Sequence, residues 1–317
     1  MLRPTKQLAP DKADDRPVSR WQVIALAGTV VTTGVLIAVL AANWDKVGRA
    51  VGLVSVATFA GLTALQILAY VLRTQVFSTC VQAAGARTSP GPLHGASAAT
   101  FLANALVPTY IGVWVRVAML RRLAPEQGPT IGQMVTADGI SLFLEAIITV
   151  VLLLLASTQL HIAWWWIALL VGICGLAGFG VWQARRRLAH RQWVRALAIF
   201  DSRWKVVGLT GILVLVLAIQ PVRFYMVLHA VGLDVSAVQA LLAFILTSTG
   251  AILPIGPGAA SVGGTAAVLG HQGLAEAAAS GVVLATSAVV AGVIYLLVAL
   301  AALGRQRRRA GVVEQAA

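Results

Sequence analysis

The sequence predicts an all-α polytopic membrane protein, with about six transmembrane helices and two re-entrant pairs of short helices in an inverted repeat. Three observations lead to this fold class. The 317 residues are 59% hydrophobic and only 11% charged, far from the composition of a soluble domain. Apolar runs of about 20 residues, enough to cross a bilayer, recur along the chain. An eight-residue phrase that breaks an uncharged stretch occurs twice.

The repeated phrase reads ALVPTYIG in its first copy and AILPIGPG in its second. Each copy has a glycine four residues after its proline, at Pro108 and Gly112 and again at Pro254 and Gly258. Proline removes a backbone donor and disrupts the preceding helical turn. Broken backbone at membrane depth is stable only where protein buries it or a wet cavity meets it. Paired breaks in two halves therefore indicate a transporter-type binding site, with two unrelated kinked helices as the alternative.

The first expected repeat covers residues 21–157 and follows a polar tail, 1–20, which we expect to be disordered and cytoplasmic. Its expected spans lie at about 21–44, 51–72 and 133–155. The second of these spans is expected to stop at Arg73, where a short polar segment begins. Residues 88–115 carry no charge and are expected to form the first re-entrant pair, which ends at Arg116.

The second expected repeat covers residues 158–304. Its expected spans lie at about 164–182, 206–227 and 277–303. Residues 185–205 hold a dense basic cluster, which predicts either an amphipathic helix on the membrane surface or a plain cytoplasmic loop. The uncharged stretch 235–275 contains the second phrase and is expected to form the second re-entrant pair. A basic cytoplasmic tail, 305–317, follows the last span.

The distribution of basic residues predicts the orientation. With both termini in the cytoplasm, all but three of the 24 Lys and Arg residues fall on the inner side, the exceptions being Lys46, Arg49 and Arg223. Because each half has three spans, the second half crosses the membrane upside down relative to the first. We therefore expect a multi-pass protein of the plasma (inner) membrane, and not a nucleic-acid-binding protein. Eight full spans, with each broken stretch crossing twice, are the alternative.

Candidate substrate-binding residues gather at the two breaks and in the neighbouring spans. Arg116 follows the first break and is expected to meet a phosphate. Asp138 and Glu145 are seven residues apart, so they share one face of a membrane helix, where ionisable groups are functional candidates. Their expected partners are Arg116, Arg73 or Arg223, in a binding site or in a structural ion pair. The full set of candidates is Asn104, Pro108, Gly112, Arg116, Asp138, Glu145, Arg223, Pro254, Gly256, Pro257 and Gly258.

Signals for catalysis are weak. The five histidines lack metal-ligand spacing, and no nucleotide-binding glycine loop or nucleophile motif is found, so we predict neither a metal nor a cofactor. Cys80 and Cys174 lie in or beside apolar runs and are expected to be buried thiols rather than a disulfide. We therefore favour a protein without enzymatic activity of its own.

Asn104, Pro108, Gly112 and Arg116 form an N-x-x-x-P-x-x-x-G-x-x-x-R pattern, and a later LPIGPG opens the last part of the chain. By these residues the chain resembles the flippase-like, lysylphosphatidylglycerol synthase transmembrane-region family over roughly residues 20–305. The resemblance implies inverted repeats, re-entrant helices and the handling of lipids or lipid-linked sugars. We expect no aminoacyl-transferase domain, because few residues follow the last expected span.

Together these features predict a protein that binds and translocates (flips) an anionic phospholipid or a lipid-linked substrate. Its expected partners are membrane lipids with anionic head groups, and either a second copy of the chain or a soluble enzyme. One alternative is a membrane glycosyltransferase, or an accessory subunit, acting on polyprenyl-phosphate-linked sugars. Another is a protein that does not transport but recruits a soluble enzyme through the basic stretch 185–205.

Overall fold

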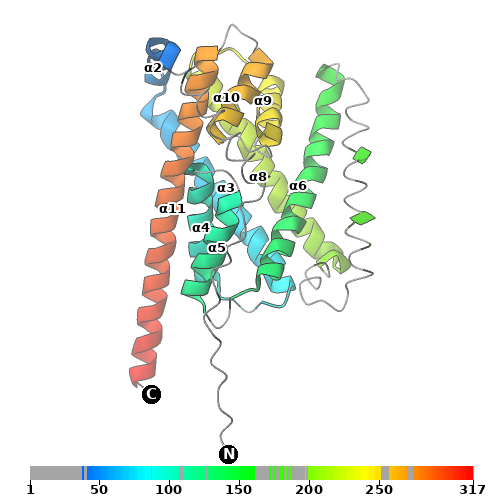
Figure 1. Ribbon diagram of the computed structural model, residues 1–317, viewed down its shortest axis with the longest axis vertical. Helices are drawn as coiled ribbons and strands as arrows, with labels where there is room; N and C mark the ends of the chain where they lie inside the picture. Colours follow the sequence, from blue (N-terminus) through cyan, green and yellow to red (C-terminus); the bar gives the residue numbers. More distant parts are fainter. Residues whose placement is uncertain are drawn as a thin grey trace, which may run out of the picture.

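The computed structural model describes residues 41–86, 88–106, 110–125, 128–160, 199–250, 257–269 and 274–316, together with residues 38, 171, 172, 175, 179, 180, 183, 186 and 197. Within these residues the regular structure is entirely helical (Figure 1). The helices are α2 (Trp44–Gly52), α3 (Val56–Ala83), α4 (Pro90–Leu106), α5 (Tyr110–Leu123), α6 (Ile131–Leu160), α8 (Arg203–Ala230), α9 (Ala237–Gly250), α10 (Pro257–Leu269) and α11 (Leu274–Ala316).

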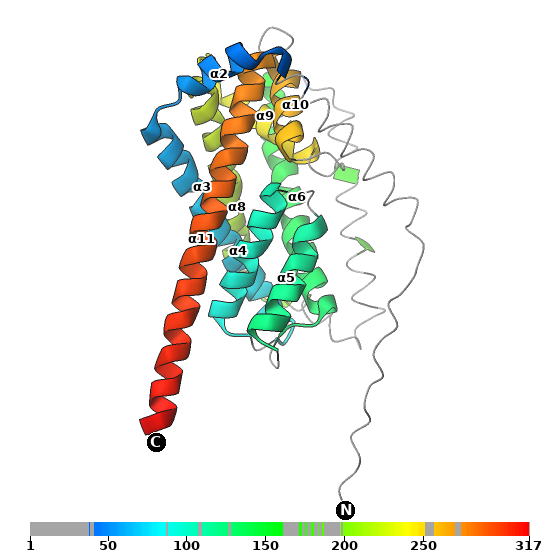
Figure 2. The same cartoon turned by 60° about the vertical axis from the view of Figure 1, so that its left-hand side comes forward.

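Four of the described helices, α3, α6, α8 and α11, contain a stretch long and apolar enough to cross a bilayer. They match the expected spans at 51–72, 133–155, 206–227 and 277–303, which confirms a multi-pass membrane protein. The other two expected spans lie almost wholly outside the described residues. Leu62 of α3 and Leu213 of α8 are fully buried where these long helices pack together. Figure 2 shows α11 running the height of the bundle, with α2 packed across its upper end.

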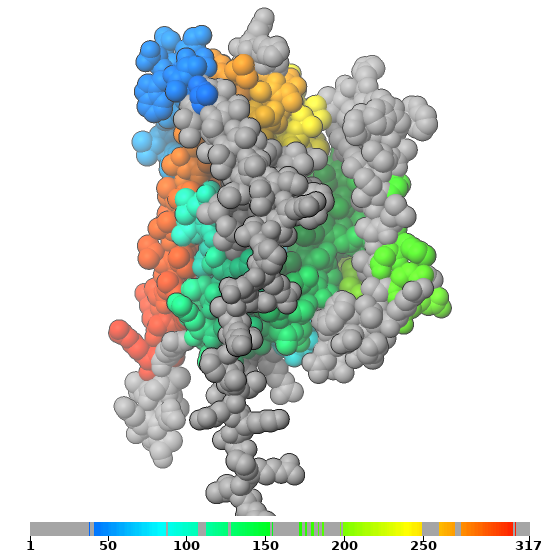
Figure 3. Space-filling model, viewed as in Figure 1, coloured from blue at the N-terminus to red at the C-terminus, as the bar shows by residue number. Residues whose placement is uncertain are grey.

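Besides α2, the described short helices pack in two pairs, α4 with α5 and α9 with α10. They contain 17, 14, 14 and 13 residues, fewer than the roughly 20 that a bilayer crossing requires. The α4–α5 pair lies in the lower half of the molecule and the α9–α10 pair in the upper half (Figure 1). The space-filling view shows the same division, with yellow and orange atoms above green ones (Figure 3). Each pair therefore has one of its ends toward the middle of the bundle.

The long helices that precede the two pairs end in the same way. α3 and α8 each have 28 residues, and each is followed by a glycine with positive φ, Gly85 at 87° and Gly232 at 93°. In both, the two N–H groups after the last turn donate back to carbonyls of that turn, which is the Schellman motif. Connections of equal length, 84–89 and 231–236, then lead into α4 and α9. The order long helix, glycine, short pair, long helix thus occurs twice.

The end of α3 differs from the expectation. The helix continues through Arg73 to Ala83, so the segment that follows Arg73 is helical and not a polar connection. Two facts explain the difference. The charge of Arg73 is compensated by Glu145 of α6, at 3.0 Å, and Val76 and Val81 are fully buried against neighbouring helices.

α5 and α11 also extend further than expected. Arg116 lies inside α5, which ends at Leu123, rather than at the end of the first pair. α11 continues through the basic tail to Ala316, because no proline interrupts it, and extends beyond the rest of the bundle (Figure 2). The last apolar span and the tail are therefore one helix.

The basic stretch 185–205 is described only at residues 186, 197 and 199–205. The backbone at Ser202 is extended, and α8 begins at Arg203, so a single helix does not run through to residue 205. Leu197 and Ile199 are buried in the core. The rest of the expected surface helix lies outside the described residues.

Candidate functional site

A cavity of about 130 Å³ lies where the two short-helix pairs approach each other. Ala105 lines it from the end of α4, beside the first break, while Thr247 of α9 and Ser261 of α10 line it from the two sides of the second break. The remaining lining residues come from α8 and α11 and are Arg223, Phe224, Gly281, Leu284, Ala285 and Ala288. At about 30 Å³ per water, the cavity has room for roughly four water molecules or a group of similar size.

Arg223 is the charged side chain of this cavity, and only 4% of it is exposed. Its Nε donates to the carbonyl oxygen of Leu62 at 3.2 Å, and its Nη2 donates to Oγ of Ser287 at 3.0 Å. Its Nη1 donates to the side-chain oxygens of Gln220, at 3.0 Å, and Gln66. A guanidinium has five N–H groups, so these four bonds hold it in place and leave one donor.

The four acceptors are neutral, and no carboxylate among the described residues pairs with Arg223. Sequence reasoning placed this residue toward the outer end of a span and counted it among the outside charges. The structure instead buries it between α3 and α11, because Gln66 and Ser287 supply acceptors there. A buried cation without a counter-ion is costly, and it attracts an anion strongly where water is scarce.

Two hydroxyl groups of the cavity have no partner. Oγ1 of Thr247 and Oγ of Ser261 are buried and make no hydrogen bond within the described residues. Ser261 follows closely on the start of α10 at Pro257, where the first N–H groups of a helix lack intrahelical acceptors and carry partial positive charge. The guanidinium of Arg223 and the hydroxyls of Thr247 and Ser261 are thus buried beside a cavity whose wall is otherwise largely apolar.

At the first break, Asn104 of α4 and Gly112 of α5 are in direct contact. A Cβ added to Gly112 would overlap the side-chain amide of Asn104, and Oδ1 of Asn104 is buried without a hydrogen-bond partner. This contact explains why the motif has asparagine and glycine on the two sides of its proline. Pro108 itself lies outside the described residues.

Arg116 is buried and has a carboxylate partner. Its Nη1 donates to Oδ1 of Asp138 at 2.6 Å, and its Nε donates to Oγ1 of Thr100 at 3.4 Å. Its guanidinium carbon lies 4.1 Å from the ring centroid of Phe77. The expected pairing of Asp138 with an arginine is confirmed, but Arg116 does not line the cavity.

Glu145 pairs with Arg73 at 3.0 Å, so both carboxylates of α6 have an arginine partner and lie on one helix face, as expected. Of the second-break candidates, Pro257 and Gly258 form the first turn of α10, while Pro254 and Gly256 lie outside the described residues. In the described ranges, no three His, Cys, Asp or Glu side chains lie close enough to share a metal ion.

Sequence reasoning missed the neutral partners of the site. Gln66, Ser287, Thr247 and Ser261 are polar residues inside apolar stretches, and this is the signal that could have found them. It is a weak signal, because small hydroxyl residues in membrane helices often bond to their own backbone. Thr74 and Thr100, for example, donate to carbonyls four residues earlier.

Comparison with protein-family models matches residues 23–303 to the family described as the lysylphosphatidylglycerol synthase TM region. Comparisons with curated proteins and with solved structures gave no match. The family match contains every residue that lines the cavity and both arginine–carboxylate pairs. The chain is therefore a membrane protein of the lysylphosphatidylglycerol synthase transmembrane-region family, which is linked to lipid modification and translocation.

Proposed function

We propose that this protein binds and translocates a lipid with an anionic, phosphate-bearing head group, either a phospholipid or a lipid-linked substrate. The observation that carries the proposal is Arg223, a buried cation that lines the cavity and has no carboxylate partner among the described residues. Guanidinium groups bind phosphate oxygens with short, charge-assisted hydrogen bonds. The unpaired hydroxyls of Thr247 and Ser261 add two donors for the same anion.

In this proposal Arg223, rather than Arg116 as expected from the sequence, binds the lipid phosphate in the cavity. The charge of Arg116 is already balanced by Asp138, and its guanidinium is held by Thr100 and Phe77. Arg223 has only neutral acceptors. An anion therefore gains more by contact with Arg223, where it does not compete with a carboxylate.

We further propose that the two short pairs are re-entrant and that the two halves form an inverted repeat. The equal lengths and Schellman ends of α3 and α8 support a repeat, and the location of the pairs in opposite halves of the molecule supports inversion (Figure 1). In transporters of this design the substrate site lies near the bilayer midplane, where the breaks meet. Rearrangement of either pair would then open the cavity to one side of the membrane.

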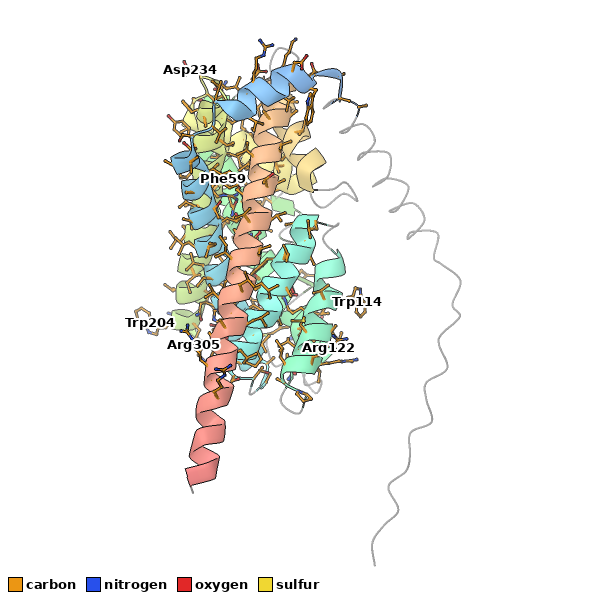
Figure 4. All side chains as sticks on the ribbon, turned by 90° about the vertical axis from the view of Figure 1, so that its left-hand side faces the viewer. Phe59, Trp114, Arg122, Trp204, Asp234 and Arg305 are labelled. Carbon is orange, nitrogen blue, oxygen red and sulfur yellow. The ribbon has the colours of Figure 1, made fainter. Side chains whose placement is uncertain are left out.

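The orientation follows from the charges at the two ends. In Figure 4, Arg122 and Arg305 lie toward one end of the bundle, and Asp234 lies at the other. Because positive residues are enriched on the cytoplasmic side, the Arg122 end faces the cytoplasm. We propose that the C-terminus then lies in the cytoplasm, that the basic N-terminal tail lies on the same side, and that the protein occupies the plasma (inner) membrane.

A vesicle assay tests this function. Purified protein is reconstituted with fluorescent phosphatidylglycerol or phosphatidylcholine, and lipid movement between leaflets is measured for wild type, Arg223→Gln, Arg223→Lys and the exposed-residue control Arg305→Gln. We expect faster movement of the anionic lipid in wild type and the control, loss of that preference in Arg223→Gln, and partial retention in Arg223→Lys. Equal activity of wild type and folded Arg223→Gln would contradict the proposal. Movement of a polyprenyl-phosphate-linked sugar but not of phospholipids would assign the lipid-linked substrate.

A further inference from the structure

Four charged residues form two ion pairs that lie two turns apart along α6, one to α5 and one to α3. This group, here the charge cluster, consists of Arg73, Arg116, Asp138 and Glu145. It lies close to the cavity along α3, because Gln66, which accepts a hydrogen bond from Arg223, precedes Arg73 by seven residues. Seven residues are two turns, so both side chains share a helix face and lie about 10 Å apart along the axis.

Arginines continue from the charge cluster toward the end of the bundle. Arg116 lies inside α5, and Arg121 and Arg122 occupy its last turn, before the turn that leads to α6. Arg121 and Arg122 are exposed. Cations therefore occur in the cavity, in the charge cluster and at the exposed end of α5.

The two ion pairs differ in which partner is more exposed. Asp138 is 28% exposed, whereas its partner Arg116 is only 8% exposed and lies against Phe77 and Thr100. In the second pair, Arg73 is 36% exposed and Glu145 15%. In the first pair an anion can therefore replace the more exposed Asp138 while Arg116 keeps its position. In the second pair Arg73 is the more exposed partner, so an anion can meet this arginine directly.

Phosphate is chemically suited to this exchange. A phosphodiester presents two anionic oxygens to a guanidinium, as a carboxylate does, and forms the same charge-assisted hydrogen bonds. Charged groups inside a membrane span are expensive and tend to mark the path of a charged substrate. Within the described part of the chain, the carboxylate partners of both arginines come from one helix, α6, and such an arrangement would suit the path of a charged substrate.

We propose that the charge cluster is a second binding site for the lipid phosphate, in which the phosphate takes the place of Asp138 at Arg116 or of Glu145 at Arg73. The inference rests on the proposed function and adds a second phosphate-binding site between the cavity at Arg223 and the surface at the end of α5. The carboxylates balance the positive charge of the arginines when no lipid is present. The lipid phosphate then displaces a carboxylate from its arginine.

Neutralising the carboxylates tests the exchange, because it removes the competitor and leaves the cation. The probe is short-chain phosphatidylglycerol, titrated against purified full-length protein in detergent, with short-chain phosphatidylcholine and inorganic phosphate in parallel. We expect Asp138→Asn to bind phosphatidylglycerol about five- to tenfold more tightly than wild type, the size of an ordinary coupling between two sites. The gain should vanish in the double variant Arg116→Gln/Asp138→Asn. A carboxylate with a purely structural role would give unchanged or weaker binding.

The second pair provides an independent variant. If Asp138→Asn does not yield folded protein, Glu145→Gln tests the same exchange at Arg73, whose greater exposure makes the loss of its partner easier to tolerate. Equal gains for inorganic phosphate and phosphatidylglycerol would mean that the cluster is a site for free phosphate, and would overturn the lipid assignment.

The two proposals fail in different ways. If wild type binds phosphatidylglycerol and Arg223→Gln does not, but neither carboxylate variant binds more tightly, then the exchange is wrong and the proposed function stands. If wild type does not distinguish phosphatidylglycerol from phosphatidylcholine, the proposed function itself is wrong.

Discussion

Nη1 of Arg116 lies 2.6 Å from Oδ1 of Asp138, and this ion pair joins α5 to α6, two helices that otherwise have few contacts. Arg116→Gln leaves Asp138 without its partner, so we expect a loss of about 3–5 kcal/mol in the free energy of unfolding. The double variant Arg116→Gln/Asp138→Asn should lose much less than the two single variants combined. Unfolding of the purified proteins in detergent measures all three. Strictly additive losses would show that the two side chains do not interact.

The contact between Asn104 and Gly112 predicts one substitution that lowers stability and a second substitution that restores it. Gly112→Ala places a methyl group on the amide of Asn104, and overpacking of this kind costs about 1–3 kcal/mol. Asn104→Ala in the same chain should recover most of the loss, because it removes the overlapping atoms. Gly139→Ala in α6, where a Cβ meets open space, is the control. Failure of Asn104→Ala to rescue Gly112→Ala in the unfolding assay would argue against the contact.

Variants of the unpaired cavity hydroxyls distinguish an effect on lipid affinity from an effect on protein stability. Thr247→Val and Ser261→Ala remove buried polar atoms that have no partner, so we expect stability to stay the same or to rise. Affinity for short-chain phosphatidylglycerol should fall about tenfold in each, the value of one hydrogen bond to a charged group. Thr265→Val is the matched control, because Oγ1 of Thr265 is also buried and unpaired but does not line the cavity. If all three variants bind equally well, the hydroxyls are not ligands.

Neighbouring glycines of α10 should respond in opposite directions to alanine. A Cβ on Gly264 would lie 2.6 Å from the backbone nitrogen of Thr247 and 2.9 Å from the carbonyl oxygen of Ala243, so Gly264→Ala must separate α9 from α10. We expect a loss of about 1–3 kcal/mol in stability. A Cβ on Gly263 meets open space, and Gly263→Ala should stabilise the helix by up to about 1 kcal/mol. Thermal unfolding compares the two, and equal shifts would contradict the close packing of α9 on α10.

The proposed orientation can be tested by cysteine labelling. In a chain with Cys80→Ala and Cys174→Ala, single substitutions Arg122→Cys, Arg305→Cys and Asp234→Cys are exposed in turn to a membrane-impermeant thiol reagent. We expect Asp234→Cys to react in intact cells, and the other two only in inside-out vesicles. Reaction of all three from one side would contradict the proposed topology.

The long helices were predictable from the sequence because each contains an apolar run of about 20 residues. Four apolar runs matched four long helices, but where a charge was taken as a stop the helices continue, α3 to Ala83 instead of residue 72 and α11 to Ala316 instead of residue 303. Arg73 looked like the end of a span because sequence alone does not reveal a compensating charge on another helix. The partners of Asp138 and Glu145 were predictable because the two carboxylates share a face and few arginines lie within reach.

By itself, then, the sequence determined the membrane class, four of the spans, the pairing of short helices around each proline–glycine phrase, and the partnership of α6 carboxylates with arginines. Those properties follow from composition, periodicity and spacing, which are local. Only the tertiary structure decided which arginine carries an unbalanced charge. Arg223 and Arg116 look alike in the sequence, but Asp138 neutralises one, and neutral acceptors from α3, α8 and α11 surround the other. Charge compensation depends on which helices become neighbours, and the packing of the whole bundle sets that.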